Sequence, residues 1–232
     1  MVEQLTDDEQ VEALKKWWKE NGTAIIVGII IGISAIVGFW KWNQHVEIQA
    51  LAASQQYDNF TQAVIDNKPE EIENYFTILK ADYVGTSYAA LAALLYASYE
   101  YDKNNAEKSL EYLRWAQQNP GHDALLHIAQ VRLAKLLVAQ DKLDEAFSLI
   151  EKIKEPAFDV QYAEIKGDIY TKRGEQALAR TSYLLALASS ELNGKQREFV
   201  QMKLDDLGAP PAELKSNDEA GEKVQTNLEA DK

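Results

Sequence analysis

An uncharged run of 20 residues, from Asn21 to Trp40, constrains this chain more than any other feature of its sequence. A helix rises about 1.5 Å per residue, so the run would be about 30 Å long, the thickness of the hydrocarbon core of a bilayer. Four of the five tryptophans flank it: Trp17, Trp18, Trp40 and Trp42. Indole rings favour the two membrane interfaces. The sequence therefore predicts a transmembrane helix over residues 21–42.

A cleaved signal peptide is the main alternative to an uncleaved anchor. Its apolar region is usually about 7–15 residues long and is followed by small residues at the cleavage site. Here the run is longer, and the polar segment Lys41-Trp42-Asn43-Gln44 follows it. A buried core helix is the other alternative. We expect the anchor.

Lysines predict the orientation of this helix. Lys15, Lys16 and Lys19 lie just before the run, whereas Lys41 is the only lysine or arginine after it until Lys68. Basic residues favour the cytosolic side. We therefore expect a single-pass protein of a bacterial inner membrane, with residues 1–20 as a cytosolic stub and the C-terminal domain in the periplasm.

Two smaller features accompany the span. Thr6-Asp7-Asp8-Glu9 has the pattern of a capping box, which predicts a helix start near Asp7. Gly28 and Gly32, four residues apart, would let another membrane helix approach closely. The other interpretation of these glycines is that membrane helices are often glycine-rich.

Beyond the membrane the sequence predicts helices and no strands. Apolar residues recur at steps of three and four, as on one face of a helix: Val46, Ala50, Ala53, Tyr57, Phe60 and Val64. No helix breaker interrupts this pattern before Asn67-Lys68-Pro69. We expect one long helix up to that point and a short helix from Glu70 to Lys80.

The chain then repeats itself. Three windows align on small or apolar residues, in four sets: Ala97, Ala134 and Gly167; Ser109, Ala146 and Ala179; Leu113, Ile150 and Tyr183; Ala116, Ile153 and Ala186. Asn104, Asp141 and Gly174, which tolerate a left-handed turn, lie seven residues after the first set, at spacings of 37 and 33. Such a period is typical of stacked helix–turn–helix pairs.

The third window is the most specific. Gly167, Tyr170, Gly174, Ala179, Tyr183 and Ala186 together resemble a tetratricopeptide repeat (TPR). The predicted fold class is thus all-α, with a single transmembrane helix followed by a TPR-like helical-repeat solenoid over residues 43–208. A last helix from Gly194 to Leu207 would cover the stack through Phe199, Met202 and Leu207. Residues 209–232 are polar and are expected to be a disordered tail.

Composition and motifs argue against catalysis, cofactors and nucleic-acid binding. The chain has no cysteine and a net charge of −13, and phosphate binding needs clustered basic residues. No HExxH, Walker A, GxGxxG or GxSxG motif occurs, and His122 and His127 are five residues apart. Glu164 and Asp168 are four apart, which suits acid–base work but is more typical of a solvated helix face. We expect no enzyme, cofactor or metal site.

A binding surface is what remains. The first helices of the pairs would line a concave groove, apolar at one end and acidic at the other. Its candidate residues are Leu91, Leu94, Tyr101, Ile128, Val131 and Val138, with Gln161, Glu164 and Asp168 at the acidic end. An apolar groove can take an extended or helical peptide. The alternative is that some of these side chains are ordinary inter-helix core.

Residues 9–22 (EQVEALKKWWKENG) enter a glycine-rich span that ends GFWKW at residues 38–42. This region resembles the YfgM family of ancillary SecYEG translocon subunits, and the repeat region agrees with it over about residues 3–208. The resemblance implies contact with the SecYEG translocon, a PpiD-type periplasmic chaperone and unfolded exported chains. It also implies a link from the cytosolic stub to an Rcs-type regulator. A TPR scaffold for envelope or cell-wall assembly is the rival hypothesis, because the fold alone does not separate the two.

Overall fold

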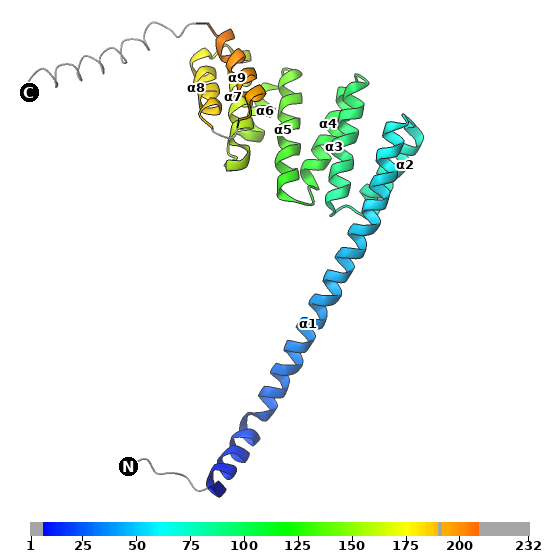
Figure 1. Cartoon of the computed structure of the whole chain (residues 1–232), viewed down its shortest axis with the longest axis vertical. Coiled ribbons are helices and arrows are strands. Elements are labelled where there is room, and N and C mark those ends of the chain that lie inside the picture. The colour runs from blue at the N-terminus through cyan, green and yellow to red at the C-terminus, as the bar shows by residue number, and fades with distance from the viewer. Residues whose placement is uncertain (1–6, 190–191, 209–232) are drawn as a thin grey trace, which may run out of the picture. The chain divides into compact units, whose positions relative to one another are not determined.

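The computed structural model describes residues 7–189 and 192–208 of the chain. It has two compact units, Met1–Gln55 and Gln56–Lys232, and the division falls inside one helix. That helix, α1 (Asp7–Ile65), is uninterrupted along its length (Figure 1). The single long helix is confirmed, and its start near Asp7 stays a prediction because Asp7 is the first residue that the structure describes. Thr6, the predicted cap, lies outside the described residues, and the boundary between residues 42 and 43 stays a prediction because it lies within α1.

The second unit consists of short helices in antiparallel succession (Figure 1). They are α2 (Pro69–Asp82), α3 (Ser87–Asp102), α4 (Ala106–Gln118), α5 (Asp123–Ala139), α6 (Leu143–Ile150), the 3-10 turn η1 (Pro156–Phe158), α7 (Asp159–Arg173), α8 (Gln176–Leu187) and α9 (Gly194–Asp206). No strand occurs in the described part of the chain. The predicted short helix after Pro69 and the predicted last helix are thus confirmed as α2 and α9.

Four chain reversals share one backbone geometry. Asn67, Asn104, Asp141 and Gly174 have positive φ angles of 52°, 62°, 58° and 77°. At each of them the amide donates to the carbonyl three residues back, and the next amide donates to the carbonyl five residues before itself. This is the Schellman motif, which satisfies the last carbonyls of the preceding helix. Three of these reversals were predicted from the repeat, and the structure confirms them.

The reversal at Asn67 reveals a helix pair that the repeat alignment missed. It lies 37 residues before Asn104, so the end of α1 and α2 form a first pair. Its residues in the aligned positions are large: Phe60, Ile72, Phe76 and Leu79, all buried. The alignment started from small residues and therefore passed over this pair, although the 37-residue spacing was present in the sequence.

An aromatic cluster holds this first pair to the second. The ring of Phe76 on α2 lies 5.2 Å from that of Tyr96 on α3 and 5.1 Å from that of Tyr112 on α4, both edge-on, and Tyr96 stacks on Tyr112 at 4.3 Å. Each such pair contributes about 0.5–1.5 kcal/mol beyond area burial. The Tyr96 hydroxyl donates to Glu73 Oε2 at 2.7 Å. Burial, and then this carboxylate, raise the pKa of Tyr96.

The aligned small and apolar positions form the contacts within and between pairs. All of them are buried except Ile153, which follows the end of α6. Gly167 is the tightest position, because a Cβ there would lie 2.3 Å from Cε1 of Tyr183. The Tyr183 ring has little freedom to move, since its side chain is buried and its hydroxyl donates to Asp168 Oδ1 at 2.8 Å. Gly167 therefore sets how closely α7 and α8 approach.

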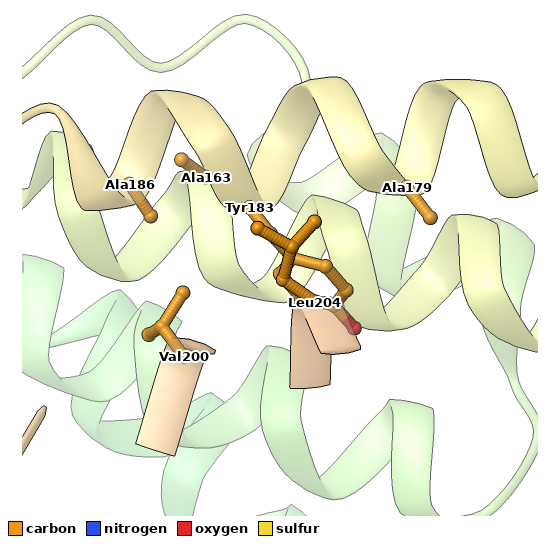
Figure 2. Packing of buried hydrophobic residues seen from close by; sticks show 6 residues of the cluster. All are labelled: Ala163, Ala179, Tyr183, Ala186, Val200 and Leu204. Carbon is orange, nitrogen blue, oxygen red and sulfur yellow. The ribbon is translucent and has the colours of Figure 1, made fainter. Parts of the chain in front are cut away.

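Of the residues predicted to cover the stack, Leu207 is partly buried and packs against it, whereas the buried contacts come from two other residues of the last helix. Val200 and Leu204 of α9 are buried and point toward Ala163 of α7 and toward Tyr183 and Ala186 of α8 (Figure 2). The prediction was wrong for Phe199 and Met202, which are about half exposed. The α9 sequence is apolar on more than one face, so its periodicity did not decide which face turns inward.

Gly167→Ala is expected to destabilise the repeat domain by about 1–2 kcal/mol. Overpacking a filled core costs about 1–3 kcal/mol, and a contact of 2.3 Å places this site in the upper part of that range. The cost therefore outweighs the helix propensity of about 1 kcal/mol that alanine adds over glycine. Urea unfolding of the detergent-solubilised chain, followed by circular dichroism, measures the change. Gly194→Ala is the control, because a Cβ at Gly194 meets nothing within 4 Å. A Gly167→Ala protein as stable as wild type would contradict the argument.

Candidate functional site

An open groove lies between α3 and α5, with α4 as its floor. Its cavity measures about 320 Å³. The walls are Leu94, Ala97, Ser98 and Tyr101 of α3 and Arg132, Lys135, Leu136 and Ala139 of α5, and Ser109 and Leu113 of α4 form the floor. The small side chains at residues 97, 98, 109 and 139 leave the space open. Apolar atoms dominate the interior, and polar groups stand at the rim.

The structure places the six predicted groove residues in different surroundings. Leu94 and Tyr101 line the cavity, and Tyr101 is half exposed. Leu91, Ile128 and Val131 are partly buried and lie outside the cavity lining. Val138 is buried. A role in binding stays a prediction for all six.

Two basic residues of the groove were missed by the sequence reasoning. Arg132 and Lys135 follow Ile128 at helical spacing and form one face of α5 with Ala139. That spacing was visible in the sequence. The prediction for this part of the groove considered apolar residues, and so it missed a face of α5 on which two basic side chains lie between Ile128 and Ala139.

Arg132 reaches across the groove. Its Nη1 donates to the backbone carbonyl of Leu94 on α3 at 3.4 Å. Within residues 7–189 and 192–208 it makes no other hydrogen bond or ion pair. A guanidinium has five N–H donors, so most of its donors face the groove or solvent.

The predicted acidic end of the groove is neutralised instead of solvated. Glu164 of α7 is buried, and its Oε1 lies 2.7 Å from Nζ of Lys203 on α9. Its Oε2 lies 3.2 Å from Nζ of Lys135 on α5. Lys203 also donates to both oxygens of Asp168 at 2.8 Å. The expectation that Glu164 and Asp168 form a solvated face was wrong, because lysines of two neighbouring helices cover them.

The two lysines, rather than burial, determine whether Glu164 is ionised. Burial alone would raise the pKa of Glu164, but its hydrogen bonds and charge attraction to Lys203 and Lys135 outweigh burial and hold that pKa below its ordinary value. Glu164 therefore stays ionised. The cluster ties α5, α7 and α9 together and has no free carboxylate that suits acid–base catalysis.

The histidines of the repeat domain have structural roles. The Nδ1 atom of His122 accepts the amide of Ala124 at 3.2 Å and caps α5. His127 Nδ1 lies 2.8 Å from the hydroxyl of Tyr162, which itself donates to Gln130 Oε1 at 3.0 Å. The His127 ring nitrogen must then be the donor to Tyr162. No group of three or more metal-ligating side chains occurs in the part of the chain that the structure describes.

The span of α1 is the second candidate site. Among the described residues, α1 is the one helix long and apolar enough to cross a membrane. Its tryptophans and its isoleucines other than Ile25 are exposed, so apolar side chains are available to lipid. A Cβ at Gly28 or Gly32 would meet nothing within 4 Å, so both glycines are open to another helix. Their role in packing stays a prediction.

A lipid-facing helix that leads into stacked helix pairs defines the class: a membrane-anchored helical-repeat protein. The family model of the tetratricopeptide repeat-like domain matches residues 15–209. The ancillary SecYEG translocon subunit of Escherichia coli (strain K12) is 30% identical over 204 residues, which cover 87% of this chain and 96% of the relative. No solved structure matches the chain.

Two further relatives carry the same name. The ancillary SecYEG translocon subunit of Haemophilus influenzae is 29% identical and that of Neisseria gonorrhoeae 26% identical, each over 208 residues, 89% of this chain and 100% of the relative. The chain belongs to the tetratricopeptide repeat-like family that includes these subunits.

Stability is expected to fall in acid through Glu164. Its pKa in the folded chain lies below the ordinary value of 4.5. The carboxylate therefore contributes stability fully above about pH 4.5, and this contribution is lost as the pH falls through the folded-state pKa. Urea unfolding at several pH values should show Glu164→Gln destabilised at neutral pH and approaching wild type in acid. Glu145→Gln is the control, since Glu145 forms an exposed ion pair with Arg114. A Glu164→Gln deficit that is constant with pH would refute the assignment.

Lys203→Met is expected to cost about 2–3 kcal/mol. Breaking a buried ion pair costs about 3–5 kcal/mol, and Lys135 still covers part of Glu164. Thermal unfolding measures the loss, with Lys195→Met, an exposed lysine on the same helix, as control. Adding Asp168→Asn should restore part of the stability, because it removes the carboxylate left without its cation. Equal stability of Lys203→Met and Lys195→Met would show that the ion pairs of Lys203 with Glu164 and Asp168 do not stabilise the packing of α9.

Proposed function

We propose that this protein is an accessory subunit of the SecYEG translocon. The observation that carries the proposal is that relatives named for this role align over nearly their whole lengths with this chain. The alignment to the family model begins at residue 15, so it includes the span as well as the repeats. A shared anchor and a shared repeat domain support a shared role.

The proposed topology follows from the charges beside the span. Lys15, Lys16 and Lys19 keep residues 1–20 in the cytosol, which leaves the repeat domain on the periplasmic side of a bacterial inner membrane. In this position the domain meets chains as they leave the translocon. The cytosolic stub is the segment available to an Rcs-type regulator.

The repeat domain is proposed to act as an adaptor. It would connect exported chains to a periplasmic chaperone of the PpiD type. An adaptor needs a surface that binds peptides and has no need of a nucleophile or a cofactor. The groove between α3 and α5, apolar inside and basic at the rim, supports this role.

Co-purification from membranes tests the proposal. The tagged chain, extracted in mild detergent, is expected to bring translocon subunits and a PpiD-type chaperone, identified by mass spectrometry. Exchange of residues 21–42 for an unrelated span should abolish recovery of the translocon. Recovery of cell-wall or division proteins without translocon subunits would refute the proposal and favour a scaffold for envelope assembly.

The double change Gly28→Leu with Gly32→Leu tests whether these glycines are the contact. Leucines on this face would keep a neighbouring helix away, so co-purified translocon should fall at least tenfold. Gly38→Leu is the matched control: a Cβ there also meets nothing within 4 Å, and the residue lies on a different face of α1. Unchanged recovery with the double variant would place the contact elsewhere on the span.

A further inference from the structure

We infer that the groove between α3 and α5 binds an extended segment of a partner protein in which a large apolar residue stands next to an aspartate or glutamate. The inference rests on the proposed role of the repeat domain as an adaptor, and it names the chemistry that this adaptor recognises. Shape, charge and the state of the neighbouring grooves support it independently.

The groove has the dimensions of a short peptide site. Along α3 it extends from Leu94 to Tyr101, about 10 Å at 1.5 Å per residue, which matches about three residues of extended chain. Its volume of about 320 Å³ is at the lower end of the range for ligand pockets. Leu94, Leu113 and Leu136 provide an apolar interior, and the half-exposed Tyr101 stands at the rim. One large apolar side chain with its flanking backbone fits these features.

Charge selects an acidic neighbour for that apolar residue. Arg132 lines the groove, and in the described chain its one polar contact is the long bond to the Leu94 carbonyl. The other basic residue, Lys135, is already bound to Glu164. Arg132 is therefore the available anchor, and a guanidinium binds a carboxylate through two parallel hydrogen bonds. Acidic residues outnumber basic ones by 37 to 24 in the chain, so a basic groove contrasts with the rest of the surface.

Toward the C-terminus, the neighbouring helices of the stack are bridged by ion pairs. Lys135 connects α5 to α7 through Glu164, and Lys203 connects α9 to α7 through Glu164 and Asp168. Between α3 and α5 the one hydrogen bond or ion pair among the described residues is the 3.4 Å contact of Arg132 with the Leu94 carbonyl. No carboxylate of the described chain pairs with Arg132, so a partner's carboxylate would not have to displace one. This arrangement leaves the groove between α3 and α5 ready for a ligand.

Fluorescence anisotropy with the full-length chain in detergent micelles tests the inference. The probe is a labelled, C-terminally amidated peptide of glycine and serine with one leucine between two aspartates. We expect it to bind, and we expect at least tenfold weaker binding when the aspartates become asparagine, when they become lysine, or when the leucine becomes serine. A probe with a free C-terminal carboxylate in place of the aspartates separates a terminal from a side-chain carboxylate.

Two variants assign the binding to the groove. Arg132→Met should weaken binding of the aspartate probe at least tenfold. It should leave the weak binding of the asparagine probe unchanged, because that probe has no carboxylate for Arg132 to bind. Ser98→Leu should weaken binding of both probes, since it fills the groove from an exposed helix position. Arg114→Met is the control for the loss of one arginine, as Arg114 lies outside the groove lining and pairs with Glu145.

Several results would overturn the inference. They are equal binding of the aspartate and lysine probes, Arg132→Met binding as wild type does, no binding at millimolar peptide, and preference for the free C-terminal carboxylate. Tighter binding after removal of residues 209–232 would make the chain's own tail the occupant. Weaker binding at higher protein concentration would make it a second copy. Co-purification with the translocon is measured for Arg132→Met in parallel: if it persists while peptide binding fails to depend on Arg132, the inference is wrong and the proposed function still stands.

Discussion

The reversal within each helix pair of the repeat domain depends on one residue in the left-handed region of φ. A chain can reverse within a few residues only if the last carbonyls of the helix that ends find hydrogen-bond donors. The Schellman motif supplies these donors. Asn67, Asn104, Asp141 and Gly174 occupy this position with the same hydrogen bonds. The stack, and with it the groove between the first helices of successive pairs, follows from this repeated reversal.

Contacts between the helix pairs then determine which spaces between neighbouring first helices are filled. Gly167 brings α7 against Tyr183, and the lysines of α5 and α9 meet the carboxylates of α7. These ion pairs take the place that an apolar contact would otherwise fill. Between α3 and α5 the small side chains of Ala97, Ser98 and Ala139 leave space. The candidate binding site is thus a place where the side chains of α3 and α5 leave a cavity of about 320 Å³.

Much of the fold could be predicted from the sequence. The uncharged run predicted α1, and the repeat predicted three of the four reversals. The first helix pair was missed because Phe60 and Ile72 stand where the other pairs have small residues. The face of α9 was assigned wrongly, since Phe199 and Val200 are both apolar and adjacent. Of the groove residues, Leu94 and Tyr101 line the cavity, whereas Arg132 was overlooked because the search was for apolar groove residues.

The sequence by itself determined the membrane helix, the all-helical class and the positions of the turns. These properties depend on local quantities: the length of an apolar run, the helical period, and the few residues that tolerate a positive φ. Only the tertiary structure decided which charged side chains pair with one another and which do not. Lys203 and Glu164 are 39 residues apart in the chain, and no local pattern predicts that they meet. The pairing of charges across helices depends on how the pairs stack. For that reason the open groove, and an arginine in it that pairs with no carboxylate of the described chain, became visible only in the folded chain.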